Sequence, residues 1–237
     1  MTRRLIEQWI PSAGIGVEGL RERATFTALP PPFALHVWWA RRPLIASRAA
    51  IAASLLPAWP TNAEAHVDEV AGRVLQQLQE HFPGGESQYQ AWFVRLIGIL
   101  GDPIAGRAAI VAAKVTSTKL AGNGYGYPRA FTVKPAEQDV ERFLDLVATL
   151  SGAVAPPVVL DSFAGGGSIP FESVRLGCDT IANELNPVAS AILQGTVVLP
   201  SRLGGDFVAA LEKYGTRWSD RVRSRMSSYF PREGSES

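Results

Sequence analysis

Apolar residues recur at helical spacing among polar ones along most of the chain. Up to about residue 150, apolar residues recur every three or four positions in segments separated by Pro and Gly. This pattern predicts helices over residues 3–10, 17–25, 44–56, 65–80, 87–100, 103–115 and 136–150. We expect an extended, proline-rich turn at residues 29–33 and a linker-like stretch at residues 57–64.

After Pro156 the pattern changes to that of a small sheet. Val158-Val159-Leu160 is short, apolar and mostly β-branched, which is typical of a buried parallel strand. A helical segment over residues 168–176 and a second strand over residues 179–182 follow, with helices at 186–194 and 206–226. The chain is therefore expected to have an α/β part at its C-terminal end.

A glycine cluster follows the first strand, and an acidic residue follows the second. The cluster reads Asp161-Ser162-Phe163-Ala164-Gly165-Gly166-Gly167-Ser168, and Glu184 comes 23 positions after Asp161. Parallel strands end at the edge of the sheet where α/β proteins bind ligands, and glycines let a ligand approach the backbone. An acid about 20 residues further on binds ribose hydroxyls in nucleotide-type sites. The pattern predicts a site for a nucleoside-containing ligand.

Two ligand classes suit this arrangement. A dinucleotide site needs a third glycine where this chain has Pro170, and Asp161 is poorly placed beside a pyrophosphate. A carboxylate at the strand end suits a positively charged ligand, and S-adenosylmethionine carries a sulfonium and an ammonium. We therefore favour S-adenosylmethionine over a nicotinamide cofactor.

The same residues resemble a known family. Asp161-x-Phe163-Ala164-Gly165-Gly166-Gly167 resembles the first motif of Rossmann-like methyltransferases, above all the DNA amino-methyltransferases, and Asn183-Glu184-x-Asn186-Pro187 resembles the second. Leu5-Ile6-Glu7-x-x-Ile10-Pro11 and His36-x-Trp38-Trp39-Ala40-Arg41-Arg42-Pro43-Leu44 are similar to a domain of unknown function that opens adenine-specific DNA methylases, including one from phage-defence islands. The resemblance covers residues 3–56 and about 157–200.

This resemblance implies a fold and a cofactor site. The fold would be a partial Rossmann-like core of an S-adenosylmethionine-dependent methyltransferase, preceded by a mainly helical region. We expect three parts: residues 1–56, a helical insert at 57–155 and an incomplete cofactor-binding core at 156–237. Glu184 would bind the ribose and Asn186 would lie near the adenine. The methionine part would be held by Asp161, Ser162, Phe163, Ala164, Gly165, Gly166 and Gly167.

The block at residues 36–43 allows three interpretations. Trp39 and Arg41 could form a wall of the cofactor site, Arg41 and Arg42 could contact DNA phosphates, or the tryptophans could be core anchors. His36 is more easily explained as a packed or hydrogen-bonded histidine than as a base. The sequence leaves these interpretations open.

The catalytic motif of the amino-methyltransferases is missing. That motif is Asp/Asn/Ser-Pro-Pro-aromatic and binds the flipped base, whereas the Pro-Pro pairs here, at residues 30–32 and 156–157, lack the preceding acid or amide. We expect the N-terminal, cofactor-binding portion of an adenine-N6 DNA methyltransferase of restriction or phage-defence type, completed by a C-terminal methylase polypeptide. The alternative is a non-catalytic S-adenosylmethionine-binding or interaction module.

Composition narrows the setting of the protein. Hydrophobic residues make up 46% and the formal net charge is +1, which is typical of a globular protein without a global nucleic-acid signature. The single cysteine, Cys178, excludes a disulfide framework within the chain and favours a cytoplasmic setting, and we expect it to be buried and inert. We expect no metal and no membrane partner. The basic last helix and the loop at residues 122–128 are more easily explained as a solvated face and a surface loop than as DNA-binding elements.

Overall fold

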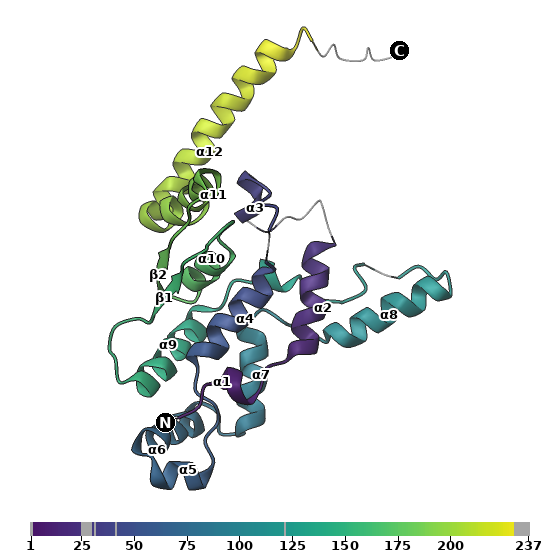
Figure 1. Cartoon of the computed structure of the whole chain (residues 1–237). Coiled ribbons are helices and arrows are strands. Elements are labelled where there is room, and N and C mark those ends of the chain that lie inside the picture. The colour runs from purple at the N-terminus through teal and green to yellow at the C-terminus, as the bar shows by residue number, and fades with distance from the viewer. Residues whose placement is uncertain (1, 25–29, 31, 41, 121, 230–237) are drawn as a thin grey trace. The chain divides into compact units, whose positions relative to one another are not determined.

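The computed structural model describes residues 2–24, 30, 32–40, 42–120 and 122–229 (Figure 1). The chain forms two compact units, residues 1–197 and 198–237. The described residues are mostly helical and contain a small two-stranded parallel sheet, so the mixed α/β class is confirmed in this coarse sense. The expected boundaries at residues 56 and 155 stay predictions.

The first unit contains eleven of the α-helices and both strands among its described residues. In chain order the elements are α1 Leu5–Gln8, α2 Ser12–Arg23, α3 Pro32–Leu35, α4 Leu44–Leu55, α5 Asn62–Val67, α6 Glu69–His81, α7 Glu86–Leu96, α8 Pro103–Val115, the 3-10 turn η1 Ala130–Thr132, α9 Glu137–Ser151, β1 Val158–Asp161, α10 Ser168–Arg175, β2 Asp179–Ala182, α11 Pro187–Leu193 and the π-helical turn η2 Gln194–Val198.

Side-chain caps explain where several helices begin. The expected helix at 65–80 is instead two helices, because Asp68 is extended and its carboxylate accepts the Val70 and Ala71 N–H groups that begin α6. α5 begins inside the stretch that was expected to be a linker, where Thr61 and Glu64 form a capping box. The expected extended turn at 29–33 is wrong at its end, because α3 begins at Pro32, a residue that the first turn of a helix tolerates.

The core of the first unit surrounds α4. This helix packs against α1, α2 and α10, and α6 packs against α9 (Figure 1). Most of the core is aromatic and aliphatic, with Tyr89, Trp92 and Phe93 fully buried. Arg48 on α4 and Glu172 on α10 are also fully buried, and they form an ion pair with Nε–Oε2 and Nη2–Oε1 distances of 2.5 and 3.2 Å. The helix that follows the glycine cluster is therefore fixed to the centre of the core.

The two strands lie parallel, as expected, with Val159 opposite Thr180 and Asp161 opposite Ala182. α10 packs against both strands, and the Thr180 hydroxyl bonds the Ser173 hydroxyl of α10 at 2.8 Å. The expectation of a buried first strand is wrong: Val158 is 60% exposed and Leu160 is 66% exposed. The described residues cover only one face of this sheet, so alternate side chains of β1 point to solvent.

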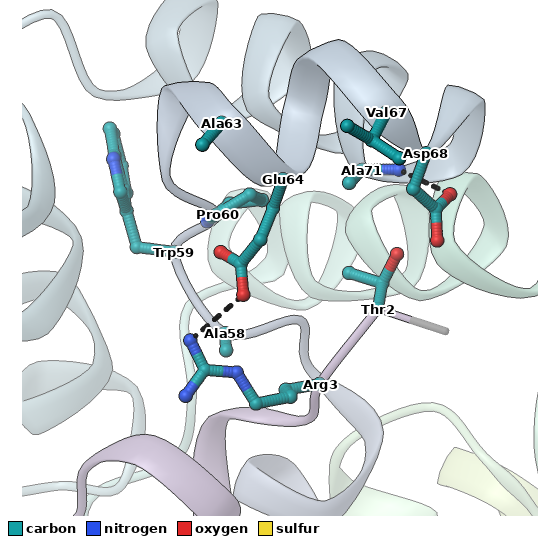
Figure 2. A pocket seen from close by; sticks show the side chains of 10 residues that line it. All are labelled: Thr2, Arg3, Ala58, Trp59, Pro60, Ala63, Glu64, Val67, Asp68 and Ala71. Atoms are coloured by element: carbon teal, nitrogen blue, oxygen red, sulfur yellow. Dashed lines mark hydrogen bonds and ion pairs between the residues drawn. The ribbon is translucent and has the colours of Figure 1, made fainter.

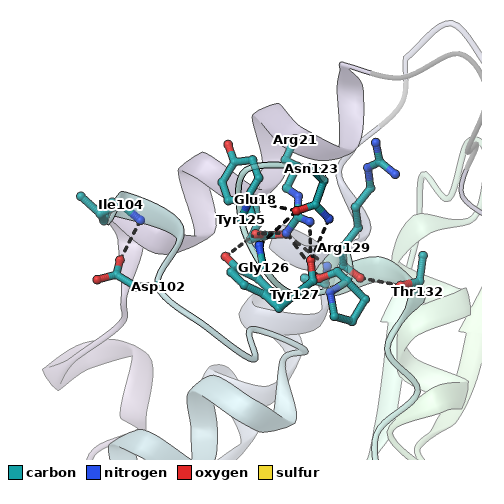
Figure 3. Close-up of polar contacts among 12 residues, drawn as sticks. Glu18, Arg21, Asp102, Ile104, Asn123, Tyr125, Gly126, Tyr127, Arg129 and Thr132 are labelled. Carbon is teal, nitrogen blue, oxygen red and sulfur yellow. Dashed lines mark hydrogen bonds and ion pairs between the residues drawn. The ribbon is translucent and has the colours of Figure 1, made fainter. Parts of the chain in front are cut away.

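The loop at residues 122–128 is held firmly against α2 (Figure 3). The Tyr127 hydroxyl donates to Glu18 Oε1 at 2.8 Å, and the Arg21 guanidinium donates to the Tyr127 carbonyl at 2.6 Å. Arg21 also lies over the Tyr125 ring, 4.1 Å from its centroid. Tyr127 and Glu18 are buried. This loop is a structural contact with α2 rather than a plain surface loop.

The second unit consists of α12, Leu199–Met226, which contains the expected helix at 206–226 and extends it towards the N-terminus. Gly204, with φ 56° and ψ −143°, interrupts its helical geometry. None of its described residues is buried, although Leu211, Tyr214 and Trp218 recur at helical spacing. The apolar stripe of this helix is exposed.

Candidate functional site

The glycine loop, residues 162–167, is hydrogen-bonded to the end of the second strand. The Asn183 N–H donates to the Asp161 carbonyl at 2.9 Å, and the Ala164 N–H donates to the Asn183 carbonyl at 3.1 Å. Asp161 Oδ1 accepts the Phe163 N–H at 3.2 Å, which closes a turn directly after β1. The two strand ends and the loop between β1 and α10 therefore form one connected edge, as the parallel order of the strands requires.

Glu184 links this loop to the segment after β2. Its Oε2 accepts the Gly165 N–H at 2.7 Å and its Oε1 accepts the Asn186 N–H at 2.9 Å. These backbone hydrogen bonds, that of Asn186 first, lower the pKa of Glu184. The carboxylate is therefore ionised at neutral pH, and each oxygen has a further lone pair for a hydroxyl donor.

Two of the three glycines have left-handed backbone conformations. Gly165 has φ 51° and Gly167 has φ 83°, values that side-chain-bearing residues rarely adopt. Gly166 is needed for space, because a Cβ atom there would lie 2.9 Å from Trp38 Cβ. A Cβ atom at Gly165 would also lie 3.0 Å from Trp38 Nε1. The close approach at the loop is thus made by Trp38, so the glycines alone do not indicate a ligand.

Trp38 and Arg42, from the block at residues 36–43, contact the candidate site. Trp38 is buried and clusters with Ala189 and Ile192 of α11. The Ser168 hydroxyl, at the start of α10, donates to the Arg42 carbonyl at 3.0 Å. Both contacts attach the N-terminal part of the chain to the glycine loop. Trp38 therefore fits the interpretation of a core anchor, and it lies against the glycine loop, where the cofactor-wall interpretation had expected its neighbours Trp39 and Arg41.

The other predicted residues differ in their surroundings. Trp39 is 84% exposed and Phe163 is 83% exposed, so both rings are accessible near the loop. Asn186 uses its side-chain oxygen to cap α11 through the Val188 and Ala189 N–H groups. Ala164 is buried, and the Ser162 carbonyl accepts from Asn183 Nδ2 at 3.3 Å. His36 is exposed, and Arg41 lies outside the described residues.

Metal-ligating clusters and membrane-spanning helices are both absent from the described residues. No group of three or more His, Cys, Asp or Glu side chains within them could hold a metal ion. Within the same residues, no helix combines the length and the apolar character that crossing a bilayer requires.

Comparison with known proteins gives one match. Residues 9–76 are similar to a family described as a protein of unknown function (DUF1156). No curated protein matches the chain. No solved structure matches it either. The matched segment includes Trp38, which lies against the glycine loop, and Arg48, which pairs with Glu172 of the helix that follows the loop, so this segment is in direct contact with the candidate site.

Proposed function

We propose that the chain binds S-adenosylmethionine at the carboxyl ends of β1 and β2, as the cofactor-binding portion of a DNA adenine-N6 methyltransferase. One observation carries the proposal: Asp161 is the last residue of β1, and Glu184, two positions after the last residue of the adjacent parallel strand β2, is hydrogen-bonded to the glycine loop. A partial Rossmann-like core is the fold that this βαβ unit favours.

The residues present suit the charge and the hydroxyls of this ligand. Glu184 is ionised and held in place by two backbone donors, which leaves acceptor capacity for the two hydroxyls of a ribose. Asp161, at the neighbouring strand end, offers a carboxylate to a cationic methionine group. When bound, S-adenosylmethionine supplies an electrophilic methyl group; the residues of this chain would bind and orient it. Trp39 and Phe163 would offer exposed rings beside the site.

Under this proposal, the transfer step needs base-binding residues that residues 1–237 do not supply. Phe33, the one aromatic residue that follows a Pro-Pro pair, is 3% exposed in the helix α3 region and cannot stack on an extruded base. The uncovered sheet face with Val158, Leu160 and Ile181 is where further elements of a methyltransferase core would pack. We propose a C-terminal methylase polypeptide as that partner, DNA as the substrate and a restriction or phage-defence system in the cytoplasm as the setting.

A non-catalytic S-adenosylmethionine-binding or interaction module is the second candidate. It is favoured because no Pro-Pro-aromatic sequence within residues 1–237 is preceded by the Asp, Asn or Ser of the catalytic motif. The two candidates differ in one measurement: transfer of labelled methyl groups to DNA in the presence of the partner polypeptide. Transfer that depends on this chain supports the enzyme, and binding without transfer supports the module.

Calorimetric titration of the full chain with S-adenosylhomocysteine tests the shared part of both candidates. We expect saturable binding that Glu184→Ala weakens by about tenfold or more, because hydrogen bonds to charged groups contribute about 1.5–3 kcal/mol. Asp161→Asn should weaken the binding of S-adenosylmethionine more than that of S-adenosylhomocysteine, because only the former carries a positively charged sulfur. Glu141→Ala, an exposed acid on α9, is the matched control and should change nothing. A folded wild-type protein that releases no heat would refute the proposal.

A further inference from the structure

α12 is the longest helix of the described residues, and nothing in its own unit packs against it. The second unit has this one helix among its described residues, 198–229, and no residue of α12 is buried (Figure 1). Even the short α5 of the first unit packs against α6, and these two helices and Trp59 line a cavity of about 370 Å³ (Figure 2). Because helices in proteins owe most of their stability to the packing of an apolar face, α12 needs a partner.

The apolar side chains of α12 follow a spacing that is typical of paired helices. After the interruption at Gly204, steps of three and four residues alternate without a break along one stripe, which we call the seam. The seam consists of Val208, Leu211, Gly215, Trp218, Val222 and Arg225. This spacing turns a narrow stripe towards a second helix, so that each side chain fits between four side chains of that helix. The spacing therefore favours a helix as the partner of α12.

The charges of α12 leave most of the seam free. Arg225, at the end of the seam, is the one charged residue in it. The other charged residues between positions 208 and 225 lie beside the seam or on the outer face of the helix, namely Glu212, Lys213, Arg217, Asp220, Arg221 and Arg223. Arg223 and Asp220 pair with each other on the outer face, with an Nη1–Oδ1 distance of 3.6 Å. A partner helix could therefore cover the seam as far as Val222 without burying a charge.

A second copy of α12 fits this seam when the two helices run in opposite directions. A register that places Gly215 opposite Trp218 of the second copy also places Leu211 opposite Val222. Glycine inside a helix lowers the stability of that helix, but here it leaves the space that the indole ring of the other copy needs. In a parallel pair, Trp218 would face Trp218 and Gly215 would face Gly215, so a crowded layer would lie beside a gap. The antiparallel order is therefore the better packed one.

The residues beside the seam agree with the antiparallel order. In the same register, Arg221 faces Tyr214 of the second copy, and an arginine packs favourably over a tyrosine ring. On the other side of the seam, Glu212 faces Ser219 of the second copy. No two like charges meet across the pair at these positions, so the net positive charge of the helix does not oppose the contact there.

We propose that two copies of this chain associate through an antiparallel pair of α12 helices, with Trp218 of each copy packed over Gly215 of the other. The seam from Val208 to Arg225 is about 27 Å long, at 1.5 Å per residue. This is short for a coiled coil, so association should be reversible and depend on protein concentration. It is independent of the candidate cofactor site, which lies in the first unit.

Sedimentation velocity of the full chain tests the pairing. The wild type should change from monomer to dimer between micromolar and millimolar concentrations. Trp218→Asp, which places a charge on the seam, should weaken dimerisation at least tenfold. Thr216→Asp adds the same charge to the exposed outer face of the same helix and should leave dimerisation unchanged.

Disulfide cross-linking tests the direction of the helices, since Cys178 is buried. When the Leu211→Cys and Val222→Cys proteins are mixed and oxidised, bonds between position 211 of one copy and position 222 of the other should predominate. In the antiparallel register, position 211 of one copy lies about 16 Å along the axis from position 211 of the other, which is too far for a disulfide. Mass spectrometry of the linked peptides distinguishes the products.

Three outcomes would overturn the proposal. The first is a folded wild-type protein that stays monomeric at millimolar concentration, as expected if a different polypeptide covers the seam. The second is equal dimerisation of the Trp218→Asp and Thr216→Asp variants. The third is a predominance of disulfides between equal positions of the two copies.

Discussion

Arg48 and Glu172 lie 124 positions apart and form a fully buried ion pair that joins α4 to α10. Arg175 adds a second cation to Glu172, at 2.9 Å, and both arginines also donate to the Val133 carbonyl. Desolvating three charges is costly, and the network is stable only when complete. It connects the segment similar to DUF1156 with the helix that begins after the glycine loop.

Breaking this ion pair should destabilise the protein strongly. We expect Glu172→Gln to lower the free energy of unfolding by about 3–5 kcal/mol, because it leaves Arg48 buried without its counter-charge. Urea unfolding followed by circular dichroism measures the change. The double variant Arg48→Met/Glu172→Met should cost less than the sum of the single variants. A loss of less than about 1 kcal/mol in Glu172→Gln would contradict the buried pairing.

Stability should fall as the pH rises through neutrality because of Glu22. Its carboxylate accepts the Leu44 and Ile45 N–H groups at the start of α4, yet burial, the largest effect, raises its pKa to about 7. Glu172 raises this pKa further and Arg48 lowers it. A folded-state pKa above the unfolded value of 4.5 gives stability that is complete below pH 4.5 and is lost as the pH rises through about 7.

Glu22→Gln tests this linkage, since the amide keeps a similar shape and does not ionise. Urea midpoints between pH 5 and 8 should decline in the wild type and decline less in the variant. Equal slopes for the two proteins would show that Glu22 does not titrate in this range.

The two adjacent tryptophans should respond very differently to truncation. Trp38→Ala removes a buried ring that contacts Gly165 and Gly166, and we expect a loss of about 3 kcal/mol in the free energy of unfolding. Trp39→Ala removes an exposed ring and should change the free energy of unfolding by no more than about 0.5 kcal/mol. Titration of the Trp39→Ala protein with S-adenosylhomocysteine then shows whether that ring is a wall of the cofactor site. Equal thermal melting curves for the two variants would argue against the Trp38 contact.

Loss of the Tyr127 hydroxyl should lower the stability of the protein, whereas loss of the Tyr125 hydroxyl should not. Tyr127→Phe removes the hydrogen bond to the buried Glu18 carboxylate, and we expect a cost of about 2 kcal/mol. Tyr125→Phe keeps the ring under Arg21 and is the matched control. Chemical denaturation of both variants measures the difference, which should vanish if the loop is not bound to α2.

Cys178 should be unreactive in the folded protein. The thiol is buried, and burial raises its pKa to about 11, so little thiolate forms at neutral pH. A thiol reagent such as dithionitrobenzoate should react slowly at pH 8 and rapidly after urea is added. Fast reaction without urea would show that the turn before β2 opens readily.

The sequence predicted most of the helices, both strands and the edge that the strands form, but it missed the break at Asp68 and the starts of α3 and α5. Helix caps such as Asp102 mark helix starts directly, and a βαβ order places Asp161 and Glu184 at one edge through handedness and register. Periodicity could not separate Trp38 from Trp39, because neighbouring residues of a turn point in different directions. It also could not pair Arg48 with Glu172, since nothing local distinguishes them from surface charges. The exposure of Leu160 depends on which other elements cover the sheet, and a run of apolar residues does not specify those elements.

The sheet has only two strands within the described residues, and an isolated parallel pair of this length does not persist in water by itself. The conformation of the glycine loop therefore depends on the packing of α10 and, through α10, on the folded core of the first unit. A ligand that binds the loop binds only the folded protein. Its binding should therefore raise the melting temperature of the entire first unit.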